Sequence, residues 1–562
     1  MSMRFLYLLI LLTGLLGLAD QAMGQRVART VFNDDAQVLM EAPEKGATKF
    51  VQQWLDREIE AVQFSTFVFL TATPDICTYD TQVGETYGDR FGPDYRGRLA
   101  AGIRGLRNEG TDALEVVTKH MHRRGKEVLA AIRMSDTHHR EISRESPLCS
   151  LFAVNHPEFV IKQPDQRTNE TALDYSYPEV RAHRLAIMKE VVGKYNVDGL
   201  ELNFVRWAKH FPRDQGREKA TIMTRYMEQI HAVMASAAKQ RDRRKLTLGV
   251  RVPESISACW RAGVDLEAWV KRGWIDYVVV STWNNTDPNL PIHEFTRFTK
   301  PAGVDTIVVM GNMIGSIYDG PPTILDRPIA MSAKHKKESY QAMLLTAAEA
   351  RAAAANYYAV GADSISFWNV GIHFGGESTA APAQRERIAR WTQAVITPER
   401  VFQGPRTYRY LPMGKGISSR KPPLRNYPWY DEGFSPLGHR NSPILTFSDD
   451  QLGKRLAFPF QMADGRDGKP LRGKLTCWIY HLNRQDQLAV DINGKTVAAE
   501  NIRRFPTGKR RGGLPGQRLE ISLADCPPFR GQNQLGLTLT ELAGQHEQPP
   551  YMEELEITVE QE

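Results

Sequence analysis

Between residues 60 and 370 the chain alternates short apolar runs, rich in Val, Ile and Phe, with longer stretches whose apolar residues recur at helical spacing. Near-continuous apolar strands that alternate with amphipathic helices are typical of a parallel sheet covered by helices. Eight runs fit this description: 64–70, 127–134, 171–176, 197–204, 246–252, 277–283, 305–311 and 363–369. Eight strand–helix units over about 310 residues predict an α/β fold of the (β/α)8 TIM-barrel type.

A doubly wound open sheet is the alternative α/β fold. It usually carries a glycine-rich phosphate-binding turn after its first strand. The residues that follow the run at 64–70, from Thr71 to Asp75, contain no glycine. The TIM barrel is therefore the preferred interpretation, and we assign it to residues 25–400.

The pattern changes beyond the barrel. Residues 401–445 are rich in Pro and in basic side chains and are interpreted as an extended connector. In 446–562 short apolar runs follow one another without helical stretches, and Asn493-Gly494 between two of them is a strong hairpin signal. Several short strands separated by turns predict a C-terminal all-β sandwich, jelly-roll-like, as an accessory domain.

The first residues indicate export. Arg4 precedes the apolar run FLYLLILLTGLLGLA, and the small residues Ala22-Met23-Gly24 follow it. This order is that of a cleavable signal peptide, and a run of about 15 residues is short for a membrane anchor of roughly 20. We expect 1–24 to be a signal peptide, the mature chain to be secreted or periplasmic, and no membrane span to remain after cleavage.

Composition narrows the set of partners. Lys and Arg total 72 and Asp and Glu 65 among 562 residues, so the formal net charge of +7 is a small difference. A dedicated nucleic-acid binder usually shows a concentrated basic stripe, and the only local excess lies in the Pro-rich 405–440, so no nucleic acid is expected. The five cysteines match no zinc or redox spacing. An exported chain could pair Cys77 with Cys149, or the cysteines could be small buried hydrophobic residues.

In a TIM barrel the active site lies where the strands end. The predicted strands end in aromatic, carboxylate, amide and arginine side chains. These suit a polyhydroxylated ligand, because rings stack on sugar faces and polar groups bind hydroxyls. The expected substrate-binding residues are Asn203, Arg206, Arg251, His138, His139, Tyr175, Trp283, Asn284, Trp368 and Asn369. A carbohydrate is thus the expected partner, and no cofactor is expected.

The run at 197–204 supplies the first catalytic candidate. Alternation along a strand turns Glu201 and Asn203 toward the barrel lumen, where a carboxyl group is costly unless it is hydrogen-bonded or functional. Glycoside hydrolysis normally needs two carboxyl groups, about 5–5.5 Å apart for retention and roughly 6.5–9.5 Å for inversion. The candidates for the second carboxyl group are Asp136, Asp174 and Glu254. Each of them could instead pair with a nearby arginine.

The segment 173–207 carries the most specific signal. It contains Pro178-Glu179-Val180-Arg181, then a helical stretch, then the run 195–203 with the sequence YNVDGLELN. In this form it resembles the third-to-fourth-strand unit of the family-10-like glycosyl-hydrolase barrels of secreted bacterial proteins. The resemblance implies a barrel over roughly 60–400 that acts on glycans, and it covers none of the C-terminal sandwich.

The segment departs from this family at Asn203, where the family usually carries the Asp best placed to be its catalytic carboxylate. An amide cannot act as acid, base or nucleophile. The predicted function is an exported glycoside hydrolase that cleaves O-glycosidic bonds by paired-carboxylate catalysis led by Glu201. A catalytically silent glycan-binding barrel is the first alternative.

Two further alternatives stay open. A metal-dependent hydrolase would use His138 and His139 beside Asp136, although the spacing gives at most half of a metal site and no metal is expected. A mainly structural envelope protein would leave the strand-end polar residues dispersed. The sugar, its linkage and the oligomeric state are not determined by the sequence.

Overall fold

The computed structural model describes residues 28–560 except 140, 163–170, 283–284, 320–328, 332–339, 371–381, 412–414, 419–441, 466–470, 509–512 and 545. The expected signal peptide, 1–24, lies outside the described residues. Across the described ranges, no helix is both long and apolar enough to cross a membrane.

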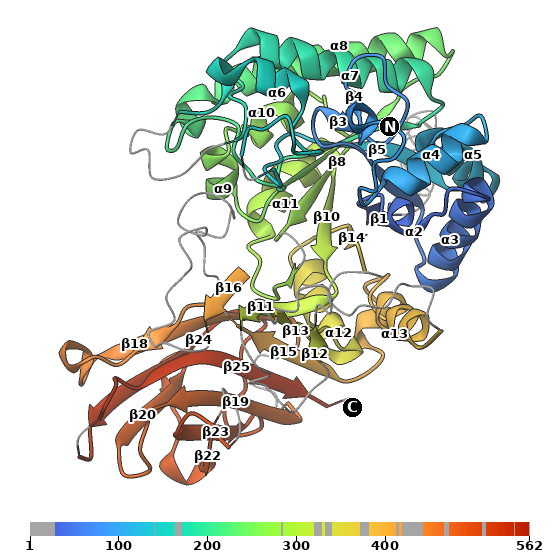
Figure 1. The fold of residues 1–562 in the computed structure, drawn as a ribbon. Coiled ribbons are helices and arrows are strands. Elements are labelled where there is room, and N and C mark those ends of the chain that lie inside the picture. Colours follow the sequence, from blue (N-terminus) through green and yellow to red (C-terminus); the bar gives the residue numbers. More distant parts are fainter. Residues whose placement is uncertain are drawn as a thin grey trace, which may run out of the picture.

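Eight parallel strands form a closed barrel in the first part of the chain (Figure 1). Around the barrel they are β1 (Val31–Asp34), β2 (Thr66–Ala72), β5 (Glu127–Arg133), β6 (Gly199–Asn203), β7 (Thr247–Pro253), β8 (Tyr277–Ser281), β10 (Asp305–Met310) and β14 (Ser364–Trp368). The sheet closes because β1 pairs in parallel with both β2 and β14. This confirms the predicted TIM barrel. Two short strands, β3 (Ile76–Cys77) and β4 (Glu85–Thr86), extend the sheet beyond β2.

One of the eight predicted strands, 171–176, is not a strand. It makes a single bridge, between Val160 and Leu173, and then a turn in which the Ser176 amide donates to the Asp174 carboxylate at 2.7 Å. The missing barrel strand is β1, whose four residues Val-Phe-Asn-Asp include only two apolar side chains. A strand usually has about five or six residues, so this run was too short to be recognised by its pattern.

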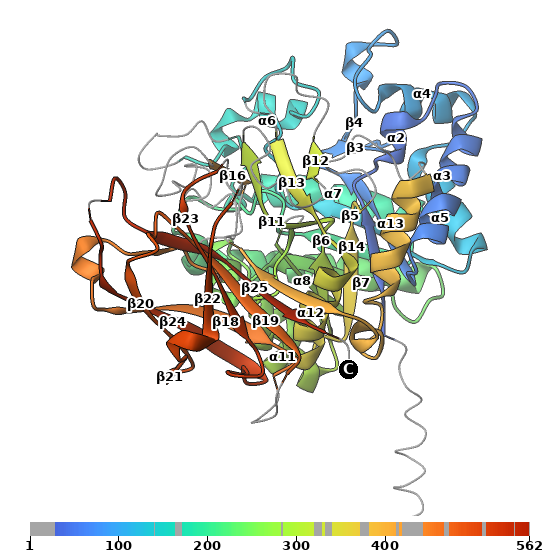
Figure 2. The ribbon, with the colours of Figure 1, turned by 90° about the horizontal axis from the view of Figure 1, so that it is seen from below.

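Helices surround the barrel (Figures 1 and 2). They are α2 (Val38–Glu41), α3 (Ala47–Ala61), α4 (Ala100–Asn108), α5 (Ala113–Arg123), α6 (Leu151–Asn155), α7 (Pro178–Lys194), α8 (Gly216–Gln240), α9 (Ile256–Arg261), α10 (Leu266–Lys271), α11 (His293–Thr299), α12 (Ala347–Ala359) and α13 (Pro382–Gln393). The longest, α8, buries Met223, Met227, Ile230 and Met234, which are three or four positions apart. This spacing places them on one face of the helix, which packs against the rest of the barrel core.

Two antiparallel sheets form the C-terminal part. One contains β15 (Arg406–Tyr410), β25 (Tyr551–Val559), β19 (Gly473–Tyr480), β23 (Gly516–Ser522) and β22 (Ile502–Pro506), with β17 (Leu445–Thr446) on β25. The other contains β18 (Arg455–Met462), β24 (Gly531–Glu541), β20 (Gln487–Ile492) and β21 (Lys495–Thr496). Their buried side chains, such as Leu555 and Leu537, share one apolar cluster, which is the arrangement of a β-sandwich.

The predicted hairpin at Asn493-Gly494 is confirmed. It joins β20 to β21, and both residues have positive φ, 55° and 80°, as a tight two-residue hairpin turn requires. Strand β15 comes from the segment interpreted as a connector, and it pairs along its whole length with β25.

A third, smaller sheet lies next to the sandwich. It consists of β12 (Ile329–Met331), β13 (Tyr340–Leu344), β11 (Met313–Asp319), β16 (Lys415–Ser418) and β9 (Asn285–Thr286). Because β9 and β11 follow barrel strands β8 and β10, this sheet continues the chain beyond the carboxyl ends of those strands.

Helix α12 connects the barrel to the sandwich. The fully buried Asn356 donates to the backbone oxygens of Pro288 at 3.0 Å and Gln461 at 2.7 Å, and its own side-chain oxygen accepts from the Ala463 amide at 2.8 Å. An unpaired buried amide costs about 1–3 kcal/mol. The two bonds to Gln461 and Ala463 therefore help to hold the sandwich in position against the barrel.

The five cysteines are all free and buried. Cys77 and Cys149 do not pair with each other. This agrees with the interpretation of the cysteines as small hydrophobic residues.

Candidate functional site

The carboxyl ends of the barrel strands carry a set of buried charged and aromatic side chains, which we call the mouth cluster. It consists of Asp35, Arg133, Asp136, His138, Arg206, Arg251, Trp368 and Asn369. All except His138 are at most 9% exposed, whereas the His138 side chain is 33% exposed. The cluster unites residues from the ends of β1, β5, β6, β7 and β14, and this convergence is expected of a TIM-barrel active site.

Arg133 joins two loops of the mouth cluster. Its Nη2 lies 2.9 Å from the Asp35 carboxylate, and its Nη1 donates to Asp136 at 2.6 Å. Asn369 holds Asp35 from another side, donating to its carboxylate at 2.8 Å and accepting from its backbone amide at 2.9 Å. Burial lowers the pKa of Arg133, but the two carboxylates outweigh it and raise that pKa above its usual range. Arg133 is therefore a permanent cation that fixes both acids.

Asp136 orients His138. The His138 backbone amide and Nδ1 approach one oxygen of Asp136 at 2.9 and 2.6 Å, and its Nε2 lies 2.7 Å from Nη2 of Arg206. Since a guanidinium only donates, Nε2 accepts and Nδ1 carries the proton, so His138 is neutral here. Burial is the main cause that lowers the pKa of His138. The Trp207 ring meets His138 edge-on, with 5.6 Å between ring centroids.

The Asp136 carboxyl group is held ionised. Burial alone would raise its pKa, but His138 and Arg133 outweigh burial and hold the pKa well below its usual range. Two hydrogen bonds from one side and an ion pair from the other leave this carboxylate in a fixed position.

Trp368 lies against two arginines. The guanidinium carbon of Arg251 is 4.3 Å from the centre of the Trp368 ring, and that of Arg206 is 5.8 Å away. Arg251 also donates twice to the Ser281 hydroxyl, at 3.0 and 2.9 Å. Burial is the main cause that lowers the pKa of Arg206 to about 9 and that of Arg251 to about 10. Both arginines remain cationic at neutral pH.

Glu201 faces the lumen, as its position on β6 predicts, and it is 0% exposed. It accepts hydrogen bonds from Asn33 on β1 at 2.6 Å and from the Tyr277 hydroxyl on β8 at 2.9 Å. Tyr277 reaches it because Gly249 leaves room: a Cβ at 249 would lie 2.1 Å from the tyrosine ring. Burial raises the pKa of Glu201, although the charge of Arg251 acts against it.

Asn203 ends β6 with a turn. Its side-chain oxygen accepts from the backbone amides of Val205 and Arg206, at 2.9 and 3.1 Å. The amide oxygen is thus used to shape the loop that delivers Arg206 to the mouth cluster. A carboxylate oxygen at this position would accept from the same two amides.

Glu254 is not brought together with Glu201. Alternation along β7 turns Arg251 into the lumen and Glu254, three positions on, toward the helices. The charges that act on the Glu254 carboxyl group are those of Arg261 and Asp287 rather than those of the mouth cluster. Glu254 is 0% exposed, and burial is the main cause that raises its pKa to about 8.

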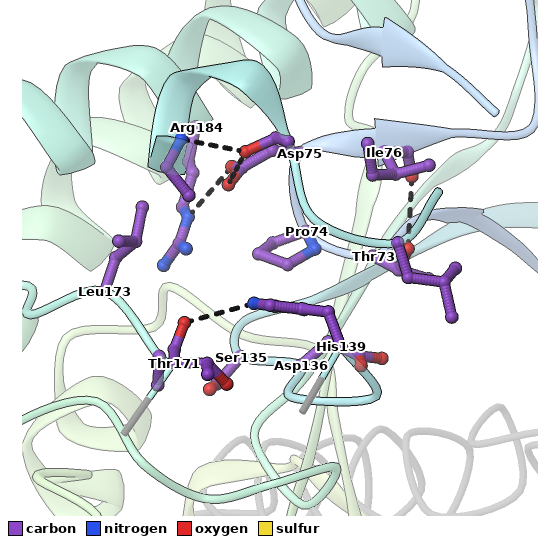
Figure 3. A pocket seen from close by; sticks show the side chains of 14 residues that line it. Thr73, Pro74, Asp75, Ile76, Ser135, Asp136, His139, Thr171, Leu173 and Arg184 are labelled. Carbon is purple, nitrogen blue, oxygen red and sulfur yellow. Dashed lines mark hydrogen bonds and ion pairs between the residues drawn. The ribbon is translucent and has the colours of Figure 1, made fainter. Parts of the chain in front are cut away.

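Asp174, Tyr175 and His139 form their ion pair and hydrogen bonds with residues outside the mouth cluster. The Asp174 carboxylate is 3.9 Å from Lys219, and the buried Tyr175 hydroxyl donates to the Met134 backbone oxygen at 2.5 Å. His139 approaches the backbone oxygen of Thr171 at 3.2 Å, beside a small hollow that also contains the buried ion pair of Asp75 and Arg184 (Figure 3). The hollow holds about 10 Å³ of free space, which is roughly the room of one water molecule.

The remaining predicted residues, Trp283 and Asn284, lie outside the described residues. Sequence reasoning missed Asn33 and Asp35, which come with the unrecognised strand β1, and Tyr277, which lies at the start rather than the end of β8. The run Val31–Asp35, two apolar residues followed by Asn-Asp-Asp, was the available signal for the first two.

The residues that the structure describes include no group of three or more His, Cys, Asp or Glu side chains that could hold a metal ion. His138 uses Nδ1 on Asp136, and His139 is directed to Thr171. The metal-dependent alternative stays an untested prediction.

Comparisons with known proteins give a match to a family model and a set of similar solved structures. No curated protein sequence matches the chain. Similar solved structures include the glycoside hydrolase domain of PgaB (BpsB) from Bordetella bronchiseptica, at 12% identity and a TM-score of 0.36, covering 61% of this chain and 93% of that one. A chitinase from Chromobacterium violaceum has 10% identity and a TM-score of 0.34, over 65% and 99% of the two chains. The GH36 α-galactosidase AgaB from Geobacillus stearothermophilus has 12% identity and a TM-score of 0.33, over 95% and 55%.

The fold assignment itself rests on the strand pairing described above. A family model, Glycosyl hydrolase-like 10, matches residues 85–245. This range spans β4 to the loop before β7 and includes Asp136, His138, Glu201 and Arg206. The family match therefore includes the segment 173–207, whose sequence resembles the family-10-like glycosyl hydrolases.

Proposed function

We propose that the chain is an exported, glycan-acting hydrolase that binds a sugar chain at the mouth cluster and cleaves its O-glycosidic bonds. The observation that carries this proposal is that the glycosyl hydrolase-like match at 85–245 coincides with the segment that supplies Asp136, His138, Glu201 and Arg206. His138, whose side chain is 33% exposed, and Arg206 beside it add hydrogen-bonding groups of the kind that sugar hydroxyls bind, whereas the Trp368 ring is 1% exposed and lies under two arginines.

The proposed chemistry uses two carboxyl groups with opposite environments. Burial favours the protonated form of Glu201, whereas Arg133 and His138 favour the ionised form of Asp136. Pairs of acids whose pKa values are pushed apart are typical of acid and base roles in one active site. We assign proton donation to Glu201 and stabilisation of the positive sugar transition state to Asp136.

In this scheme Glu201 gives up one proton and regains one in each catalytic cycle. Its proton passes to the leaving glycosidic oxygen as the bond from that oxygen to the anomeric carbon breaks. Water then bonds to the anomeric carbon and returns one proton to the Glu201 carboxylate. One water is consumed, and each product gains a hydroxyl group.

A catalytically silent glycan-binding barrel is the second candidate, and one observation favours it. Glu201 is fully covered and already accepts from Asn33 and Tyr277. The family that the segment resembles usually carries an Asp at position 203. Here the side-chain oxygen of Asn203 accepts hydrogen bonds from two backbone amides.

Substitution Glu201→Gln distinguishes the two candidates. It keeps the size of the side chain but removes the transferable proton. We expect release of reducing ends from a polysaccharide panel to fall by about 100-fold or more, with glycan affinity and thermal stability retained. Glu228→Gln, on the exposed surface of α8, is the matched control and should leave turnover unchanged. Equal turnover of Glu201→Gln and the natural chain refutes the proposed role, and binding without any turnover by the natural chain indicates the silent barrel.

Export is proposed from the N-terminal pattern and has its own test. The mass of the chain purified from medium or periplasm should correspond to a start at Gln25. A full-length mass in the membrane fraction would contradict the assignment of 1–24 as a cleaved signal peptide.

A further inference from the structure

A second hollow, of about 470 Å³, opens on the rim of the barrel. We call it the rim pocket. It is lined by Asp214, Arg217, Ile256, Ser257, Trp260, Arg261, Glu294 and Arg297. These residues come from the start of α8, from α9 and from α11, which follow β6, β7 and β8 (Figure 1). Segments that follow barrel strands lie at the carboxyl end of the barrel, so the rim pocket is on the same end of the barrel as the mouth cluster.

Cations outnumber acids in the rim pocket. The lining contains three arginines, Arg217, Arg261 and Arg297, and two acidic residues, Asp214 and Glu294. Glu294 already accepts from the backbone amide of Ile256 at 2.9 Å. Among the residues that the structure describes, no carboxylate lies within ion-pair distance of Arg217 or Arg297. Arg217 and Arg297 therefore add two positive charges to the pocket lining, and the charge of Arg297 also acts on Glu267, which is not among the lining residues.

Trp260 orients one of these cations. The guanidinium carbon of Arg217 lies 5.0 Å from the centre of the half-buried Trp260 ring. A stacked arginine keeps its planar fork of donors free at the edge, and it has already lost part of the side-chain freedom that binding would otherwise remove. Arg225, the other arginine of the same helix, is also exposed but does not line this pocket.

We propose that the rim pocket binds the anionic group of an acidic sugar, a carboxylate or a sulfate, on a glycan that extends from the mouth cluster. This inference rests on the proposed function and names its substrate class. Arg217 and Arg297 provide the charge-assisted hydrogen bonds, Trp260 fixes Arg217, and the pocket offers a volume of about 470 Å³. The preferred substrate is therefore an acidic polysaccharide rather than a neutral one.

Matched pairs of probes test the charge directly. Dextran sulfate is compared with dextran, and oligogalacturonate with its methyl ester, by titration calorimetry on the full mature chain. We expect the acidic member of each pair to bind more tightly, and salt to weaken only that member. The sulfate and carboxylate arms show which anionic group the pocket prefers.

Arginine substitutions locate the effect. Arg217→Gln and Arg297→Gln should each weaken binding of the preferred acidic probe about three- to tenfold and leave binding of its neutral partner unchanged. Arg225→Gln is the matched control, because it removes the same charge from the same helix outside the pocket. All three sites are exposed, so folding should be unaffected.

Three results would overturn the inference: equal affinity for the acidic and neutral members, an Arg225→Gln effect as large as that of Arg217→Gln, or no binding of either acidic probe. None of these three results would contradict the proposed function of the mouth cluster. Cleavage of a neutral glycan that Arg217→Gln leaves intact and Glu201→Gln abolishes would refute the rim pocket while supporting the proposed function.

Discussion

Glu254 allows the energetics of the structure to be tested without knowledge of the substrate. Its carboxyl group is 0% exposed, and neither of its oxygens reaches a hydrogen-bond partner on another described residue. Burial is the main cause that raises its pKa, from an ordinary 4.5 to about 8, with the charge of Asp287 adding to the rise and that of Arg261 opposing it. The folded chain therefore keeps a proton on Glu254 at neutral pH that the unfolded chain releases.

The sign and size of the effect follow from proton linkage. Below pH 4.5 both states hold the proton, so Glu254 adds no pH-dependent penalty to folding. As the pH rises from 4.5 to about 8 only the unfolded state gains charge and solvation, so stability is lost through this window and the loss levels off above it. At about 1.4 kcal/mol per pH unit, the whole loss is on the order of 4–5 kcal/mol.

The substitution Glu254→Gln removes this titration. The free energy of unfolding of both chains is measured by urea titration at steps from pH 4.5 to 8.5. We expect the stability of Glu254→Gln relative to the natural chain to increase by about 4–5 kcal/mol across this range. Glu228→Gln, at an exposed site, should show no such trend. A difference between Glu254→Gln and the natural chain that does not change with pH would refute the reasoning, because it would mean that Glu254 is ionised in the folded state.

Two further predictions concern the supports of the site. Gly249→Ala should lower the free energy of unfolding by about 1–3 kcal/mol, because the new Cβ would lie 2.1 Å from the Tyr277 ring. Gly193→Ala is its control, because no atom lies within 4 Å of a Cβ at that position. This substitution should be neutral or stabilise α7 by up to about 1 kcal/mol. Equal losses of stability in the two variants would contradict the packing argument. Asn203→Ala should cost about 1–3 kcal/mol, since two backbone amides lose their acceptor. Urea unfolding of each variant checks both predictions, and an unchanged midpoint for Asn203→Ala would show that water replaces the side chain.

Most of the barrel could be predicted because its strands are buried on both faces. Seven apolar runs of five residues or more give a continuous signal of the kind that parallel sheets produce. Strand β1 does not, because two of its four residues, Asn33 and Asp34, are polar. It is held by pairing with β2 and β14, and such long-range contacts leave no local pattern in the sequence.

The orientation of single side chains was predictable only where alternation was applied. It placed Glu201 in the lumen, where the structure also has it. The same alternation, counted from Arg251, would have turned Glu254 away from the lumen, but a list of strand-end residues does not distinguish the two faces. The apolar pattern predicts a strand at 171–176 with Asp174 near its end, but the Asp174 side chain instead caps a turn.

The partners within the mouth cluster could not be predicted from the sequence at all. Arg133 could have paired with Asp136 alone, three positions away, but it also holds Asp35, which is almost a hundred residues distant in the chain. The choice depends on how the closed barrel places β1 next to β2, with β5 on the other side of β2. Closure is a property of the whole sheet, so no local motif reports it.

A crystal structure of the Glu201→Gln variant with a bound oligosaccharide would test the central claim most directly. The account predicts a sugar ring at the mouth cluster, next to His138, with a glycosidic oxygen within hydrogen-bond distance of the residue 201 side chain. A sugar bound only elsewhere, for example on the C-terminal sandwich, with residue 201 still sealed by Asn33 and Tyr277, would contradict it.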